Sequence, residues 1–287
     1  MNVPAALPRG EGLSGRLLAV LTILAAGLVA AFVAAPRVLA GGDFGGRADL
    51  VEALRGSFVA SWNSGAADPA PDLQRVVDYW LRYHLAKAAI AAILLAVLIA
   101  LAVRVLTAFA RTGGSTAKGS TARGVLLCGS GALALTLAAG SLLAVVANLQ
   151  GAAAPYASLL PMVTDGANGA PLTGVLDQIR QQLTTAQNTG AATSPALETM
   201  IDDFVRYHAA MVAIAAVTAA ILLAAAALLG RRYARTARPE RRTRRVLAAG
   251  AALTGLLGIV FVVVAVANTT VATDPVPALL AFFEGGL

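Results

Sequence analysis

The chain has 287 residues, of which 58% are hydrophobic and 13% charged, with a net charge of +7. Ordinary globular chains carry about 25% charged residues, so this composition argues against a soluble domain and indicates a membrane protein. The single cysteine, Cys128, excludes an intramolecular disulfide, and with only two histidines a multi-histidine metal centre is not expected. We expect no cofactor. The preference for arginine over lysine suggests a GC-rich bacterial genome.

The first apolar run, residues 17–35, is uncharged and long enough to span a bilayer. One interpretation is a retained membrane helix. The other is a cleaved signal peptide, because Val38-Leu39-Ala40 resembles a small-residue cleavage site. The run is longer than the usual signal core of about 7–15 residues, which favours retention. Both interpretations place Gly41 outside the membrane.

The first long polar segment, residues 41–83, contains two helical patterns. Leu50, Leu54, Phe58 and Trp62 recur at helical spacing and predict an amphipathic helix. A linker rich in helix-breaking residues follows, and a second helix begins at Pro71. No glycine or proline separates that helix from the apolar run at 85–108, so one long helix is expected to enter the membrane.

Three further apolar runs predict membrane helices at 125–147, 209–229 and 246–267, the first and last of which end at Asn148 and Asn268. Basic loops at 109–123 and 231–245 and a second long polar segment at 149–207 connect the runs. The fold class is therefore an all-α polytopic membrane protein. It has five transmembrane helices, or four if the first is a cleaved signal.

Much of the chain repeats itself. Arg82-Tyr83-His84 returns as Arg206-Tyr207-His208, and the match extends back without gaps to Pro71 and Pro195. We predict a tandem duplication after an N-terminal region, 1–40, with a first copy at 41–148 and a second copy at 149–287. Each copy contains an outer helical hairpin, a membrane helix, a basic loop and a second membrane helix, and an outer tail ends the second copy. The apolar faces of the two hairpins are expected to pack on each other.

The charges predict the orientation. The loops at 109–123 and 231–245 are basic, whereas the two long polar segments are acidic. Because lysine and arginine in short loops mark the cytoplasmic side, we expect a multi-pass plasma membrane protein with a cytoplasmic N-terminus. The long loops and the C-terminus are then extracytoplasmic. The same distribution explains the basic run without any nucleic-acid partner.

The repeated Arg-Tyr-His stretch contains most of the candidate functional residues. At 100° per residue, His84 and His208 fall on the apolar face of their helices, while Arg82 and Arg206 fall opposite. Asp78 and Asp202 precede those arginines by four residues, the spacing of a helical ion pair. These residues fit an ordinary membrane boundary. Alternatively, the two histidines face each other as a pH-sensitive contact or a metal site with nearby acids.

Two other features concern the membrane runs. Lys87 lies one turn beyond His84, where an ionisable residue is a candidate for function but can also extend to the surface. Small residues recur at four-residue spacing and predict close helix contacts. These rows are Ala26, Ala30 and Ala34; Ala132, Thr136 and Gly140; and Gly250, Thr254 and Gly258.

No nucleophile–base pair, phosphate-binding glycine loop or metal-ligand spacing occurs, so we do not expect an enzyme. The leading hypothesis is a non-catalytic membrane protein whose outer helices form a cap for assembly or partner binding in the cell envelope. Its partners would be the lipid bilayer and an envelope protein or a second copy of the chain, and an exposed apolar patch on the cap is expected. The alternative is a small-solute channel or transporter with a polar path between the copies, past Lys87.

Overall fold

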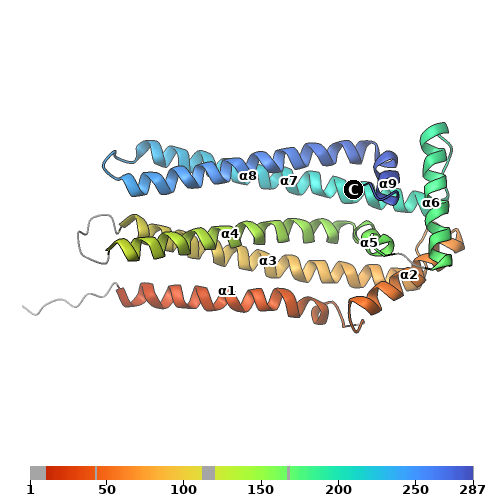
Figure 1. Cartoon of the computed structure of the whole chain (residues 1–287), viewed down its shortest axis with the longest axis horizontal. Coiled ribbons are helices and arrows are strands. Elements are labelled where there is room, and N and C mark those ends of the chain that lie inside the picture. Colours follow the sequence, from red (N-terminus) through yellow and green to blue (C-terminus); the bar gives the residue numbers. More distant parts are fainter. Residues whose placement is uncertain (1–10, 43, 112–119, 167–168, 287) are drawn as a thin grey trace, which may run out of the picture. The chain divides into compact units, whose positions relative to one another are not determined.

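A computed structural model of the chain describes residues 11–42, 44–111, 120–166 and 169–286. These residues form nine α-helices and no strand (Figure 1). The helices are α1 (Glu11–Leu39), α2 (Arg47–Ser64), α3 (Pro71–Arg111), α4 (Ser120–Ala153), α5 (Pro155–Thr164), α6 (Ala170–Thr189), α7 (Pro195–Arg235), α8 (Arg241–Thr273) and α9 (Pro275–Phe283). Much of the predicted loop at 109–123 lies outside the described residues.

Five of the helices are long and apolar enough to cross a membrane: α1, α3, α4, α7 and α8. The predicted all-α fold with five candidate membrane helices is therefore confirmed, and α3 is a single helix of 41 residues, as expected. The predicted basic loop at 231–245 is largely wrong, because α7 continues to Arg235 and α8 begins at Arg241. Polar arginines extend both helices beyond their apolar runs, since arginine is a good helix former.

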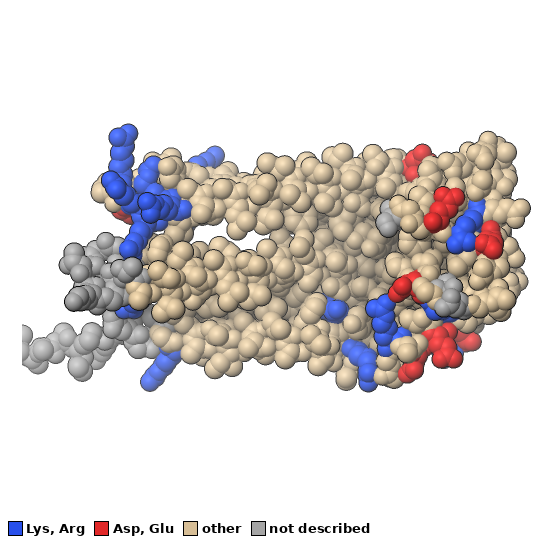
Figure 2. Space-filling model, viewed as in Figure 1, with Lys and Arg blue, Asp and Glu red and all other residues tan. Residues whose placement is uncertain are grey.

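The contacts divide the chain into two compact units, each built from separate stretches of sequence. Unit 1 comprises residues 1–34, 89–145 and 226–253, and unit 2 comprises residues 35–88, 146–225 and 254–287. Every carboxylate of the chain except Glu11 and Glu240 belongs to unit 2. In Figure 2 the acidic side chains of unit 2 are visible, as are arginines gathered around the connection between α7 and α8.

Unit 2 has the larger hydrophobic core. It is formed by α2, α5, α6, α9 and the first turns of α3 and α7. Leu54, Phe58, Ile179 and Leu183 are almost completely buried in it, so the apolar faces of α2 and α6 share one core, as predicted. The expected exposed apolar patch is wrong for the described residues, because α2, α5, α6 and α9 expose no large hydrophobic side chain.

Several helices have starts or ends in unit 2 at residues suited to those positions. Proline starts α3, α5, α7 and α9, where its missing N–H costs no intrahelical hydrogen bond. Gly65 ends α2 with φ of 66°, and Gly190 ends α6 with φ of 67°. Glycine enters this left-handed region without the steric cost of a side chain, so both helices stop there.

Unit 1 has a smaller hydrophobic core than unit 2. Its small core joins α1, α3 and α4 through Ala25, Leu98 and Ala138, and the Ser141 hydroxyl donates to the Ala91 carbonyl at 2.8 Å. The predicted rows of small residues in α1 and α4 are exposed, so that prediction is wrong there. The buried small residues nearest to the α4 row lie one or two positions away from it and are Gly131, Ala134, Ala138 and Ser141.

Candidate functional site

Each histidine of the repeated stretch is joined to an asparagine of the membrane helix that follows it. His84 Nδ1 in α3 lies 2.9 Å from Asn148 Oδ1 in α4. His208 Nδ1 in α7 lies 2.8 Å from Asn268 Oδ1 in α8. Because a carbonyl oxygen only accepts, each imidazole donates from Nδ1. The partner of each histidine is thus an asparagine, and neither ring is hydrogen-bonded to the other in the described part of the chain.

The two histidine sites differ around Nε2. A Cβ placed on Gly151 would lie 2.7 Å from His84 Cε1 and Nε2, so the ring packs directly on that glycine. His84 Nε2 is buried there without a hydrogen-bond partner among the described residues. Counted from the two matching asparagines, Val271 stands at the position equivalent to Gly151. The glycine on which His84 packs is therefore replaced by a valine in the second match.

Aromatic side chains flank both histidines on their own helices. The His84 and Trp80 ring centroids lie 4.7 Å apart, edge to face, and those of His208 and Phe204 lie 4.5 Å apart. This geometry lets each ring edge contact an aromatic face. The prediction that the histidines point inward is confirmed by these contacts and by their bonds to α4 and α8.

The other predicted residues have different partners from those expected. Asp78 accepts a hydrogen bond from Gln74 Nε2 at 2.8 Å, and Arg82 Nε donates to the Ala40 carbonyl at 2.8 Å. Arg206 pairs with Asp203 at 3.2 Å instead of with Asp202, which is exposed. The predicted i,i+4 ion pairs are therefore wrong. Arg82 bonds instead to the carbonyl just beyond α1, and Arg206 pairs with an acid three residues earlier, because an exposed ion pair gains little.

Lys87 contacts an aromatic ring one turn earlier in the same helix. Its Nζ lies 5.3 Å from the Tyr83 ring centroid, within the range of a cation–π contact. The side chain thus reaches back toward the first turns of α3. This position agrees with the alternative in which Lys87 extends toward the membrane surface.

Sequence reasoning missed Asp203, a carboxylate that is only 7% exposed. Its Oδ2 accepts from the Ala157 amide at 2.8 Å, so it caps the N-terminus of α5, whose own N-cap residue supplies no side-chain bond. Tyr156 lies beside it, and burial first and Asp203 second raise the pKa of that phenol. The available signal was an acid at the position where the first copy has Tyr79, a residue of the buried face.

Two arginines outside the predicted set of functional residues donate hydrogen bonds at the C-terminal ends of the short helices α5 and α9. Arg55 in α2 donates from Nη2 to the Asp165 carbonyl, just beyond the end of α5. Arg180 in α6 donates from Nε to the Phe283 carbonyl, the last residue of α9, at 2.8 Å. A cation at a helix C-terminus satisfies a free carbonyl and complements the helix dipole. Trp62 Nε1 also donates to Gln178 Oε1 at 2.8 Å and links α2 to α6.

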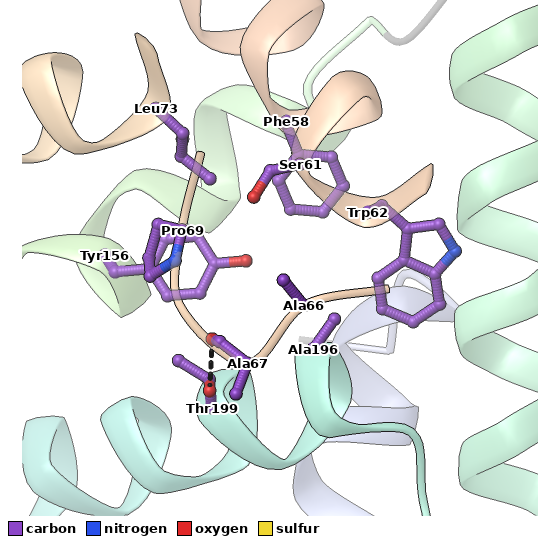
Figure 3. A pocket seen from close by; sticks show the side chains of 10 residues that line it. All are labelled: Phe58, Ser61, Trp62, Ala66, Ala67, Pro69, Leu73, Tyr156, Ala196 and Thr199. Carbon is purple, nitrogen blue, oxygen red and sulfur yellow. Dashed lines mark hydrogen bonds between the residues drawn. The ribbon is translucent and has the colours of Figure 1, made fainter. Parts of the chain in front are cut away.

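A small cavity lies in unit 2, beside the linker between α2 and α3 (Figure 3). Its volume is about 10 Å³, which is about the space one water molecule needs. The hydroxyls of Ser61 and Tyr156 point into it, and Thr199 Oγ1 donates to the Ala67 carbonyl at its edge at 2.7 Å. The cavity is too small for an organic ligand.

A larger open groove lies on unit 2 between α2 and the end of α5. Its volume is about 690 Å³. The walls carry both charges, with Arg47 and Asp165 forming an exposed ion pair at 3.6 Å. The lining residues are Arg47, Ala48, Val51, Glu52, Arg55, Met162 and Asp165.

No family model, no curated protein and no solved structure matches the chain. The class of protein is therefore defined by the fold itself. Five helices of sufficient length and apolar character indicate a multi-pass integral membrane protein.

Proposed function

We propose that the chain is a non-catalytic protein of the bacterial cell membrane whose outer helices form an extracytoplasmic cap for assembly with an envelope partner. The observation that carries this proposal is the single core shared by α2, α5, α6 and α9. That core buries the apolar faces of both outer segments and leaves a charged groove of about 690 Å³ at the surface. A folded outer body with a groove that carries both apolar and charged side chains fits recognition of a partner segment.

We also infer that the cap arose by tandem duplication. The repeated contacts support this origin, because each histidine is joined to the asparagine of the membrane helix that follows it. In addition, Arg55 and Arg180 each donate to a carbonyl at the end of a short helix, α5 or α9. The matching left-handed glycines Gly65 and Gly190 support it as well. Unrelated segments would not be expected to reproduce three such details at equivalent sequence positions.

The proposed orientation has the cap outside the cell and the α7–α8 connection in the cytoplasm. The charge difference between the units supports it, since cytoplasmic ends are enriched in arginine and lysine. The test uses single cysteines at Ala66 and Thr236 in a Cys128→Ser chain. A membrane-impermeant maleimide added to intact cells is expected to label Ala66→Cys only. Labelling of Thr236→Cys alone contradicts the orientation.

The partner proposal is tested with a photo-crosslinking amino acid in the groove. Placed at Ala48 in living cells, it is expected to give one discrete protein adduct, which the charge reversal Glu52→Arg weakens. The same crosslinker at Gln74, an exposed residue of α3, is the matched control and is expected to give no such adduct. Equal adducts at both positions, or none at Ala48, overturn the groove as the docking surface.

The transport alternative has no observation in its favour. The two cavities described above are lined by residues other than Lys87, His84 and His208. A direct test measures solute flux into liposomes containing the chain or its His84→Ala/His208→Ala variant. Flux that depends on these histidines would replace the assembly proposal with the transport one.

A further inference from the structure

The connection between α7 and α8 concentrates arginine on unit 1. Eight arginines occur between residues 231 and 245, with Glu240 as the sole carboxylate. Because α7 ends at Arg235 and α8 begins at Arg241, most of these arginines lie on the last turns of one helix and the first turns of the next. Figure 2 shows basic side chains gathered there.

Two of the eight arginines maintain the local structure. Arg244 Nη1 donates to the Thr236 carbonyl at 2.8 Å, and its guanidinium lies 4.1 Å from the Tyr233 ring centroid. Arg242 lies 5.3 Å from the ring of Phe109 at the end of α3. These contacts fasten the connection to its own helices and to α3.

The other six arginines are exposed, and their guanidinium groups have no ion-pair or hydrogen-bond partner in the described part of the chain. We call them the arginine surface: Arg231, Arg232, Arg235, Arg238, Arg241 and Arg245. Like charges gathered in this way repel one another unless an anion binds among them. The guanidinium is also the side chain best matched to phosphate, since it offers two parallel N–H donors.

The arginine surface adjoins the apolar runs of α7 and α8. Arg231 is two residues beyond Leu229 in the apolar run of α7, and Arg245 directly precedes Val246 in that of α8. Arg231, Arg232 and Arg245 are therefore within about one helical turn of the apolar runs, and Arg235 and Arg241 are within about two turns. Only 11% of the most apolar window of each helix is buried inside the protein, so acyl chains have access to both helices.

We propose that the arginine surface binds acidic phospholipids through their phosphodiester headgroups. Nucleic acid would need the arginines but not the neighbouring exposed apolar helices, and so the lipid fits both features. Anionic headgroups neutralise the repulsion among the six guanidinium groups, while the acyl chains contact α7 and α8. This role is independent of the proposed cap partner, which would bind unit 2.

The test measures binding of a fluorescent anionic phospholipid to the full chain in neutral detergent. A gain of about 1 kcal/mol per basic residue corresponds to about five-fold in affinity. The variant Arg235→Gln/Arg238→Gln/Arg241→Gln is therefore expected to bind on the order of 100-fold more weakly. The corresponding triple lysine variant retains the charge and is expected to lose far less. Arg47→Gln/Arg75→Gln, which removes exposed arginines of unit 2, is the matched control and is expected to bind normally.

Competition identifies the ligand. Excess zwitterionic phospholipid and inorganic phosphate are expected to displace little of the probe, and raised salt is expected to weaken binding. Equal displacement by inorganic phosphate would indicate a simple anion site, and stronger displacement by duplex DNA of equal charge would indicate a nucleic-acid surface. Either result overturns the proposal, as does unchanged binding by the glutamine variant. If that variant fails to fold, affinity of the wild-type chain for anionic lipid no greater than for zwitterionic lipid overturns it instead.

Discussion

His84 Nδ1 lies 2.9 Å from Asn148 Oδ1 and thereby joins α3 to α4. The bond links two candidate membrane helices beyond their apolar runs. His208 and Asn268 link α7 to α8 in the same way, at 2.8 Å. The bond uses the donor of one neutral imidazole and the acceptor of one amide. It stabilises the helix pair and needs no charge.

This bond predicts a coupling between its two members. In a double-mutant cycle of His84→Phe and Asn148→Leu, the coupling free energy of unfolding is expected to be about 0.6–1.5 kcal/mol, the range for such bonds. Unfolding in detergent with increasing sodium dodecyl sulfate measures it. The cross pair His84→Phe and Asn268→Leu is the control and is expected to be additive, because no hydrogen bond joins those residues. Additivity in the His84–Asn148 cycle would contradict the prediction.

Gly151→Ala is expected to destabilise the chain by about 1–3 kcal/mol, the usual cost of overpacking. The new Cβ would lie 2.7 Å from two atoms of the His84 ring, which must then leave its place. Gly140→Ala in the same helix is the matched control, since its Cβ meets nothing within 4 Å. It is expected to be neutral or slightly stabilising because alanine favours helix.

Thermal unfolding monitored by tryptophan fluorescence compares the two variants. A chain that carries His84→Ala lacks the clashing ring. Gly151→Ala should therefore destabilise that chain less than it destabilises the wild-type chain. An equal effect of Gly151→Ala and Gly140→Ala would show that the ring does not rest on Gly151.

The sequence is sufficient to predict the long helices and the helix face on which each histidine lies. Apolar runs and the 100° helical rotation depend only on residues close together in the chain, and so α3 could be predicted as one helix that carries His84 on its buried side. The partners of these histidines could be predicted less well. The sequence marks Asn148 only as the end of an apolar run, because a contact 64 residues away leaves no local pattern.

The incorrect predictions also concern contacts that local sequence patterns do not determine. Asp202 was assigned to Arg206 from spacing alone, although the pair that forms uses Asp203, whose position is determined by the amide of Ala157 in another helix. The rows of small residues in α1 and α4 failed for a related reason. In an alanine-rich helix almost every face carries such a row, and only packing decides which one is buried.

Asp203→Ala is expected to destabilise the chain by about 1–2 kcal/mol, since it removes the cap of α5. The Ala157 amide then loses its acceptor in a buried site, and Arg206 loses its ion-pair partner. The neighbouring acid gives a matched control, because Asp202 is exposed and its removal is expected to change stability by less than about 0.5 kcal/mol.

Hydrogen exchange locates the effect of that substitution. Amides of Pro155–Thr164 are expected to exchange faster in Asp203→Ala, whereas amides of Ala170–Thr189 should be less affected. Faster exchange throughout unit 2 would instead mean that Asp203 supports the whole core and not the start of α5.

Tyr156 predicts a loss of stability at high pH. Burial, and secondarily Asp203, raise the pKa of its phenol above the ordinary value of about 10. The folded chain therefore holds the phenolic proton more tightly than the unfolded chain does. The stabilisation is fully present below about pH 10 and is lost as the pH rises through the folded-state pKa.

Tyr156→Phe cannot titrate at this position. The difference in unfolding free energy between wild type and Tyr156→Phe should therefore shift against the wild type above about pH 10. Detergent unfolding at several pH values measures that difference, which cancels the titration of the lysines and other tyrosines. A difference that stays constant with pH would mean that the Tyr156 phenol ionises equally easily in the folded and unfolded chains.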